Sequence, residues 1–260
     1  SEVTTNAQMV LDTAQLKITY TYKYVRDTTI ASITNLRYTD EMTLLIGKNI
    51  SKFYCYGAFQ IDSLINECAS GKMSISDYYG IKDNYKSGER TRIYKNYPQS
   101  KLTFTDRLSI TNFLYQEDIP KQEWKIEKDT TTISGYKCQK ATCTFRGREY
   151  IAWFTSEIKI NTGPYKFWGL PGLIVNVYDT KKHYSFQLKE IMKSGELIVF
   201  EEQNYMKTNR KEYTRLFRKI RYEGDNFYRE YEGLISGSTI DANGNEIKPP
   251  VWNTDIIEKE

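Results

Sequence analysis

The sequence predicts a mainly β protein: a single, strongly curved antiparallel sheet, open or half-barrel in form, covered by about two helices. Aromatic residues make up 14% of the 260 residues and include 22 tyrosines, which suit the pleated, half-buried surface of a sheet. Many segments alternate apolar and polar residues, as half-buried strands do. Short turn signals separate these segments. They indicate antiparallel pairing, because parallel strands need crossovers of about a dozen residues.

The first clear strand is predicted at 16–25, where Leu16, Ile18 and Tyr20 alternate with polar residues. Further strands are expected at 42–47, 50–56, 90–98, 101–108, 112–118, 123–129, 136–145, 149–155, 173–179, 183–191 and 196–202. Arg146-Gly147 and Ser194-Gly195 carry turn signals between neighbouring strands, which predicts a hairpin at each place.

Two segments have the 3.6-residue period of an amphipathic helix. The first is "FQIDSLINECAS", residues 59–70, which is closed by Gly71. The second runs roughly from 208 to 220, with Tyr213, Leu216 and Phe217 on its apolar stripe and basic residues outside it. The residues between 71 and 90 are rich in Gly, Ser, Asp and Lys, so we expect a loop there.

We find no internal repeat or linker composition in the sequence, so we expect one domain over 1–260, with a polar N-terminal lead and a C-terminal tail. The net charge of +4 comes from mixed basic and acidic residues, and this pattern does not indicate nucleic-acid binding, which needs a concentrated basic face. No apolar run approaches the roughly 20 residues of a membrane-spanning helix. A transmembrane segment is therefore not predicted.

The stretch "GPYKFWGLPGLIVNVYD", residues 163–179, concentrates glycines, prolines and aromatic residues before an apolar strand. Leu170-Pro171-Gly172-Leu173 fits a type II turn, since proline presets φ at its second position and glycine allows positive φ at its third. We interpret Gly169, Leu170, Pro171, Gly172, Leu173 and Ile174 as a structural corner. Tyr165, Phe167 and Trp168 fill the core beside this corner, or alternatively contact a ligand or partner.

The four cysteines, Cys55, Cys68, Cys138 and Cys143, lack the spacing of a zinc site, and no metal site is predicted. Cys138 and Cys143 are five residues apart on one predicted strand, so their side chains face opposite sides. Cys55 and Cys68 flank a strand-to-helix connection, so a disulfide between them is one interpretation. Four unrelated thiols are the other.

The residues that catalysis needs do not form a recognisable pattern. His183 is the only histidine and begins a predicted strand beside two lysines, where we expect it to be exposed. The carboxylate pairs Asp40/Glu41 and Glu201/Glu202 are adjacent on strands, so they point to opposite faces and are expected at solvated edges. We therefore predict no catalytic residue and no cofactor.

Three stretches resemble the GLPGLI family of Bacteroidetes envelope proteins: "RIYKNYP" at 92–98, "ISGYKCQKATCTFRGREYIAWFT" at 133–155 and "GPYKFWGLPGLI" at 163–174. Cys138 stands where the family's "GYKCQ" motif has its cysteine. The resemblance implies an exported protein, periplasmic or associated with the outer membrane, whose signal peptide has been removed. It implies no catalytic residue, because the family is named for its motif. It also suggests a TonB-dependent transporter as a partner.

Three functional hypotheses follow. The first is a non-enzymatic cell-envelope protein that binds a small apolar ligand or docks onto an outer-membrane transport complex. The second is an envelope hydrolase that uses carboxylates, or a cysteine with His183. The third is a purely structural envelope component. A large apolar cavity lined by the sheet would favour a ligand carrier, whereas a filled interior would leave docking.

Overall fold

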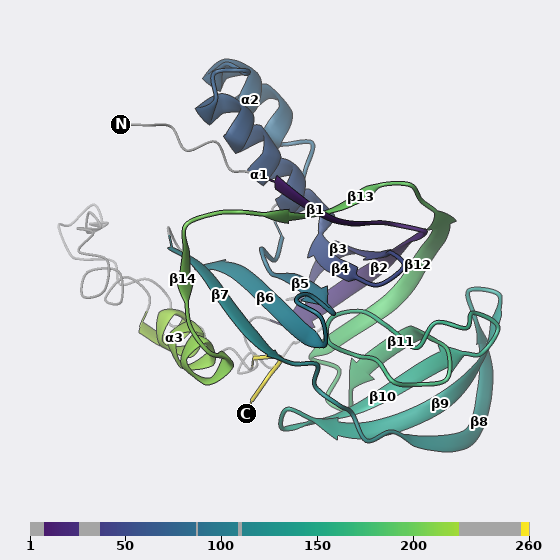
Figure 1. The fold of residues 1–260 in the computed structure, drawn as a ribbon. Coiled ribbons are helices and arrows are strands. Elements are labelled where there is room, and N and C mark those ends of the chain that lie inside the picture. Colours follow the sequence, from purple (N-terminus) through teal and green to yellow (C-terminus); the bar gives the residue numbers. More distant parts are fainter. Residues whose placement is uncertain (1–7, 26–36, 87, 109–110, 224–255, 260) are drawn as a thin grey trace, which may run out of the picture.

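The computed structural model describes residues 8–25, 37–86, 88–108, 111–223 and 256–259 (Figure 1). These residues form a mainly β structure, as predicted. The strands are β1 (Gln8–Thr13), β2 (Leu16–Val25), β3 (Arg37–Ile46), β4 (Ser51–Cys55), β5 (Arg92–Lys95), β6 (Lys101–Leu108), β7 (Thr111–Asp118), β8 (Lys125–Ile133), β9 (Tyr136–Phe145), β10 (Arg148–Thr155), β11 (Leu173–Asp179), β12 (Tyr184–Lys193), β13 (Leu197–Glu201) and β14 (Tyr205–Lys207). The helices are α1 (Tyr56–Ala69), α2 (Ile75–Lys82) and α3 (Arg210–Glu223). Residues 1–7 of the predicted lead and most of the predicted tail lie outside the described residues.

The large sheet has twelve strands in the order β14-β7-β6-β5-β4-β3-β2-β12-β11-β10-β9-β8. Its neighbours pair antiparallel except β14 and β7, which pair parallel. The sheet is open, with β14 and β8 at its edges. The strong curvature that we predicted is not confirmed, and the prediction of a single sheet is wrong, because β1 and β13 form a second, two-stranded sheet.

The second sheet begins beside the paired ends of β2 and β12, where Leu16 lies opposite Lys193. At this corner the Ala14 amide donates to the Glu196 carbonyl (2.8 Å) and the Ser194 amide donates to the Gln15 carbonyl (3.0 Å). Beyond this corner, the chain that precedes β2 is β1 and the chain that follows β12 is β13, and these two strands pair with each other. The hairpin predicted at Ser194-Gly195 is therefore wrong: β12 pairs with β2, and β13 pairs with β1.

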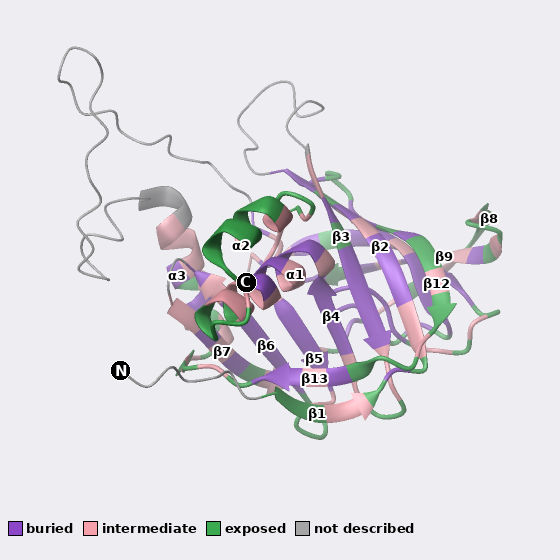
Figure 2. Cartoon of the chain, turned by 90° about the horizontal axis from the view of Figure 1, so that it is seen from above, coloured by how far each residue is buried: buried purple, intermediate pink, exposed green. Residues whose placement is uncertain are grey.

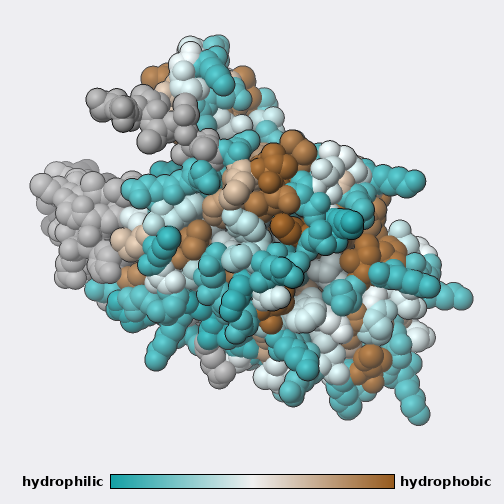
Figure 3. Space-filling model, in the orientation of Figure 1, coloured by the Kyte–Doolittle hydropathy of each residue, from teal (hydrophilic) through white to brown (hydrophobic). Residues whose placement is uncertain are grey.

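The β1–β13 ribbon packs on one face of the large sheet. Its Ile198 is fully buried and forms a small core with Ala14, Leu45 of β3 and Tyr54 of β4. Met9, Val10 and Leu197 of the ribbon are exposed, and Figure 3 shows apolar side chains at the surface near β1. The ribbon thus covers apolar residues of the sheet that would otherwise face water.

The helices confirm two predictions and correct a third. The helices predicted at 59–70 and 208–220 correspond to α1 and α3. The loop predicted over 71–90 is partly wrong, because it contains α2. The Ser74 hydroxyl accepts a hydrogen bond from the Asp77 amide (3.1 Å) and caps this helix, a signal of the capping-box type. Figure 2 shows that α2 is exposed, and no described helix is long and apolar enough to cross a membrane.

The segment between β10 and β11 closes the main core and holds the predicted corner. The amides of Leu173 and Ile174 donate to the carbonyls of Ile158 (3.1 Å) and Thr162 (3.0 Å). The Gly172 amide donates to the Leu170 carbonyl (2.8 Å) across Pro171, which is the bond of a γ-turn. The corner is therefore present, but its turn is not of the predicted type II, because Gly172 has a φ of +156° where that turn needs about +80°.

We predict that Gly172→Ala destabilises the fold. A Cβ atom at this position would lie 2.0 Å from the carbonyl oxygen of Thr155, so the corner would have to move away from β10. We expect a loss of about 2–3 kcal/mol in the free energy of unfolding, measured by denaturant titration. Gly80→Ala in α2 is the control: nothing lies within 4 Å of its added Cβ, and helix propensity favours alanine. Equal stability of Gly172→Ala and the unsubstituted chain would contradict the close approach.

Candidate functional site

Lys95, at the end of β5, anchors the segment that carries the corner. Its Nζ donates to the Thr162 hydroxyl (3.2 Å) and to the carbonyls of Gly163 (3.1 Å) and Phe167 (2.9 Å). Burial lowers the pKa of Lys95 to about 7, because removing the ammonium from water disfavours its charged form. One buried amine thus holds three points of a segment about 70 residues away in the sequence.

Lys166 lies in this segment and has no exposed surface. Its Nζ donates to the Tyr115 hydroxyl (2.9 Å) and lies 2.7 Å from Glu117 Oε1 and 2.6 Å from Glu258 Oε1. A buried ammonium is tolerated only when it is paired and hydrogen-bonded. The position of Lys166 therefore depends on β7, which supplies Tyr115 and Glu117, and on the distant residue Glu258.

Two arginines extend this ionic cluster. Arg146 Nη2 is 2.8 Å from Glu117 Oε2, and its Nε is 3.9 Å from Glu258 Oε2. Arg210, at the start of α3, lies 3.6 Å from each of the same two carboxylates. Three cations thus surround two carboxylates, and one of these carboxylates, Glu258, comes from the segment 256–259.

The segment 256–259 is held by its main chain as well as by Glu258. Arg148 donates from Nη2 (2.6 Å) and Nε (3.1 Å) to the Ile256 carbonyl, and the Tyr150 hydroxyl donates to the Ile257 carbonyl (3.2 Å). The Lys259 amide donates to the Arg146 carbonyl (2.9 Å). The β9–β10 hairpin therefore contacts the main chain of this short segment at three residues, and the segment bends at Ile257.

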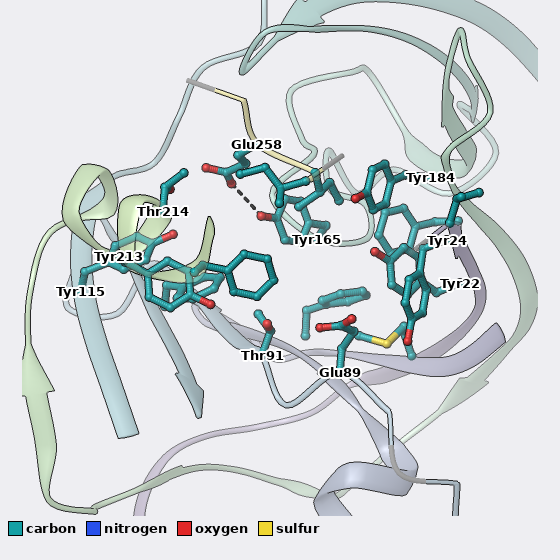
Figure 4. A pocket seen from close by; sticks show the side chains of 18 residues that line it. Tyr22, Tyr24, Glu89, Thr91, Tyr115, Tyr165, Tyr184, Tyr213, Thr214 and Glu258 are labelled. Atoms are coloured by element: carbon teal, nitrogen blue, oxygen red, sulfur yellow. Dashed lines mark hydrogen bonds between the residues drawn. The ribbon is translucent and has the colours of Figure 1, made fainter. Parts of the chain in front are cut away.

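A cavity of about 90 Å³ lies beside this cluster, between one face of the large sheet, α3 and the segment 256–259. The sheet contributes aromatic side chains that include Tyr22, Phe53, Phe104 and Phe186, and α3 contributes Tyr213 and Phe217. Figure 4 shows these rings around the cavity, with Tyr165 bonded to Glu258 (2.7 Å) at its wall. The cavity is a mainly apolar, aromatic space with two carboxylates at its walls, those of Glu258 and Glu89.

Four of the tyrosines around the cavity remain protonated. Burial raises the pKa of Tyr22, Tyr115, Tyr165 and Tyr213 well above the usual value, because a phenolate would be poorly solvated there. For Glu258, burial alone would raise the pKa, but the charge and hydrogen bond of Lys166, the Tyr165 hydroxyl and the charge of Arg146 outweigh it and lower the pKa. The site thus combines neutral hydroxyl donors with an ionised carboxylate.

A second ionic cluster holds the β1–β13 ribbon and is separate from the cavity. Glu201 of β13 lies 2.7 Å from Lys52 Nζ and accepts a hydrogen bond from the Tyr94 hydroxyl (2.6 Å). Asp40 and Glu201 are buried, whereas their neighbours Glu41 and Glu202 are exposed. Opposite faces within each pair are therefore confirmed, but the prediction of solvated edges is wrong for Asp40 and Glu201.

Of the three aromatic residues predicted as core or contact residues, only Tyr165 lines the cavity. Phe167 is fully buried in the core against Tyr150, and their ring centroids are 4.7 Å apart. Trp168 is half-buried, and its Nε1 donates to the Pro120 carbonyl (2.6 Å). Gly169–Ile174 form the corner itself. The corner therefore serves the site indirectly, by fixing Tyr165 and Lys166.

The cysteines and His183 do not have the placement that the alternative hypotheses need. Cys55 precedes α1 and Cys68 lies near its other end, so the helix separates them by roughly 20 Å. The predicted disulfide is not formed, and all four cysteines are free. Burial raises the pKa of Cys55 to about 11 and that of Cys143 to about 12, opposite to the shift of a nucleophilic thiol. His183 is buried, so its predicted exposure is wrong.

Sequence analysis missed Lys166, Arg148, Tyr150 and Glu258. Lys166 gave a weak signal, since it interrupts the aromatic run "YKFW", but an isolated lysine is usually exposed. Glu258 gave none, because it is about 90 residues from Lys166 and lies in a charged stretch. In the described part of the chain, no group of three or more His, Cys, Asp or Glu residues could hold a metal ion.

Comparisons with known proteins concern the same region. A family model described as "Protein of unknown function (Porph_ging)", of Bacteroidetes type, matches residues 145–176, which include β10 and the corner. No curated protein matches the sequence. Two solved structures, "Structure of PNGF-II in P21 space group" and "Structure of PNGF-II in C2 space group", are similar, with TM-scores of 0.54 and 0.53 at 14% identity. The similarity covers 81% of this chain and 34% of each of those chains, so it shows the fold alone, and this chain spans about a third of their length.

We predict that Lys95 gives stability a characteristic alkaline dependence. With a pKa of about 7 in the folded state and about 10.5 when unfolded, the unfolded chain binds more protons between these values. The free energy of unfolding should therefore rise with pH from 7 to 10.5, by up to about 1.4 kcal/mol per pH unit from this group. Lys95→Met should lose this rise, measured by denaturant titration, while Lys125→Met, at an exposed site, should keep it. The same slope in both variants would argue against a lowered pKa.

We predict that Glu258 also makes the free energy of unfolding rise with pH, but in the acid range. Because its folded pKa lies below 4.5, its stabilisation is complete above that value and is lost as pH falls through the folded pKa. Glu258→Gln should cost about 1.5–3 kcal/mol at pH 7, and the difference from the unsubstituted chain should shrink in acid. The exposed Glu149→Gln is the matched control. A cost that does not vary with pH would contradict the ionic role of Glu258.

Proposed function

We propose that this chain is a non-enzymatic cell-envelope protein that binds a small apolar ligand, or an apolar side chain of a partner, in the aromatic cavity. The observation that carries the proposal is the cavity itself, which is bounded by rings from β2, β4, β6, β7 and β12 of the large sheet and from α3. Spaces lined mainly by apolar side chains take up apolar groups. The tyrosine hydroxyls and the Glu258 carboxylate at its wall supply polar contacts that orient what binds.

The size of the cavity limits the ligand. With the segment 256–259 in place, its volume of about 90 Å³ is well below the roughly 300–1,000 Å³ of pockets for drug-sized molecules. A long lipid does not fit this space. We therefore favour a small apolar group over a bulky ligand, and a side chain presented by a docking partner meets this requirement.

The cell-envelope location is part of the proposal. We also propose that the chain belongs to the GLPGLI family, because the residues Gly169–Ile174 lie within the stretch matched by the family model. The resemblance supports an exported protein, periplasmic or associated with the outer membrane, and a TonB-dependent transporter as its docking partner. Among the described residues, no arrangement of carboxylates or of a cysteine with His183 favours the hydrolase alternative.

The proposal is tested with a variant that fills the cavity. Thr214 of α3 lines it and is half-buried, so Thr214→Phe should occupy the space and reduce uptake of dissolved xenon, followed by its NMR shift, by at least about tenfold. Thr130→Phe, on the exposed face of β8, should leave xenon uptake unchanged.

The same two variants, expressed with an affinity tag in a Bacteroidetes host, test the biological ligand. The unsubstituted chain and Thr130→Phe should fractionate with the envelope and co-purify with an apolar molecule or a membrane protein that Thr214→Phe loses. The proposal is overturned if all three chains purify with the same molecules, or if the protein fractionates with the cytoplasm.

A further inference from the structure

The segment 256–259, which bends at Ile257, is held through its main chain as well as its side chains. Its main chain makes contacts at three residues. The carbonyls of Ile256 and Ile257 accept hydrogen bonds, and the amide of Lys259 donates one to the Arg146 carbonyl. Main-chain bonds of this type give affinity for a peptide strand, and pockets for its side chains give specificity.

The side chains of the segment define that specificity. Ile256 and Ile257 line the aromatic cavity, and Ile256 is almost fully buried. Glu258 follows them and places one oxygen between Lys166 Nζ (2.6 Å) and the Tyr165 hydroxyl (2.7 Å), as Figure 4 shows for the tyrosine. The site thus accepts two adjacent apolar residues and then an acidic one.

The body of the protein is complementary to this pattern in charge. Without Glu258, the cations Arg146, Lys166 and Arg210 would face Glu117 as their remaining carboxylate in this cluster. Such an excess of buried positive charge is costly unless a carboxylate replaces Glu258. The cluster therefore selects a ligand that carries an anionic group.

The donors on β10 distinguish a peptide from other amphipathic carboxylates. A fatty-acid-like molecule could fill the cavity and bind Lys166, but it would offer no acceptor for the Arg148 Nε–H and Nη2–H or for the Tyr150 hydroxyl. Both residues are buried, where the loss of a hydrogen-bond acceptor is costly. A peptide carbonyl satisfies them, as those of Ile256 and Ile257 do here.

We propose that Arg146, Arg148, Tyr150, Tyr165 and Lys166 form a binding site for a short peptide segment of a partner protein, with two adjacent apolar residues followed by an acidic residue. The segment 256–259 occupies this site as an intramolecular competitor. The inference rests on the proposed function, because it names the class of ligand whose apolar side chains enter the aromatic cavity.

The probe is a fluorescein-labelled peptide, NTDIIEKE, with the sequence of residues 253–260, titrated by fluorescence anisotropy. Its receptor is the full chain with the double substitution Ile257→Ser and Glu258→Ser, which weakens the chain's own segment. This variant should bind the peptide at least about tenfold more tightly than the unsubstituted chain, because a tethered competitor acts at an effective concentration in the millimolar range. A peptide with glutamine in place of its glutamate at position 258 should bind at least about tenfold more weakly.

A conservative pair of variants tests the receptor side. Added to the double variant, Tyr150→Phe removes only the hydroxyl that donates to the Ile257 carbonyl and should weaken peptide binding about threefold to tenfold. Tyr178→Phe, on β11 and half-buried, is the matched control and should bind like its parent. Equal binding by these two variants would overturn the assignment of Tyr150 to the site.

Other occupants give different results. Absence of peptide binding to the double variant at 1 mM, on the order of the effective concentration above, overturns the proposal and makes 256–259 a structural clasp only. Binding of dodecanoate without binding of the peptide identifies an amphipathic carboxylate instead and also overturns it. If the double variant does not fold, Glu258→Gln is used as the receptor instead. Absence of peptide binding to this variant then overturns the proposal. If the peptide does not bind but Thr214→Phe still reduces xenon uptake, the peptide site is wrong and the proposed function stands. Failure of the peptide proposal is therefore distinguishable from failure of the proposed function.

Discussion

The Lys166 ammonium, removed entirely from water, sets the arrangement of the site. Burying a charge of this kind is unfavourable unless opposite charges and hydrogen-bond acceptors surround it closely. Glu117 and Glu258 provide the charges and Tyr115 provides a hydroxyl acceptor, all within 2.9 Å. Since these groups come from β7 and from the segment 256–259, satisfying one lysine brings together parts of the chain that are far apart in sequence.

The ionic cluster specifies geometry more than it adds stability. A buried ion pair often contributes little net free energy, because desolvation offsets the Coulomb attraction, whereas loss of one partner is strongly unfavourable. Misplacement of the segment 256–259 would leave three cations around the single carboxylate of Glu117 in this cluster and would take the Ile256 carbonyl away from Arg148. The cluster therefore discriminates among alternative packings, and the same discrimination would apply to any ligand in place of the segment.

The corner contributes to the site at one remove. Close approach of Gly172 to β10, together with the three hydrogen bonds from Lys95, holds the segment between β10 and β11 against the sheet. Tyr165 and Lys166 lie in this segment and face the cavity and the ionic cluster. The glycine-proline motif Gly169–Ile174 thus has a structural role, and Lys166, within the preceding aromatic run, makes the ionic contacts of the site. Similarity to the PNGF-II structures shows the fold only and assigns none of these contacts.

Local pattern in the sequence determined the mainly β class, most of the antiparallel strands, α1, α3 and the corner, because period, propensity and turn chemistry act over a few residues. It did not determine the β1–β13 sheet, since the bend at Gln15 and at Ser194 depends on β2 and β12 being neighbours. The helix that separates Cys55 from Cys68 was itself predicted, but its consequence for the disulfide appeared only in three dimensions. The pairing of Lys166 with Glu258 was decided by tertiary structure alone. The energy of a buried ion pair depends on the distance between the charges and on their removal from water. Neither can be inferred from the spacing of residues along the chain.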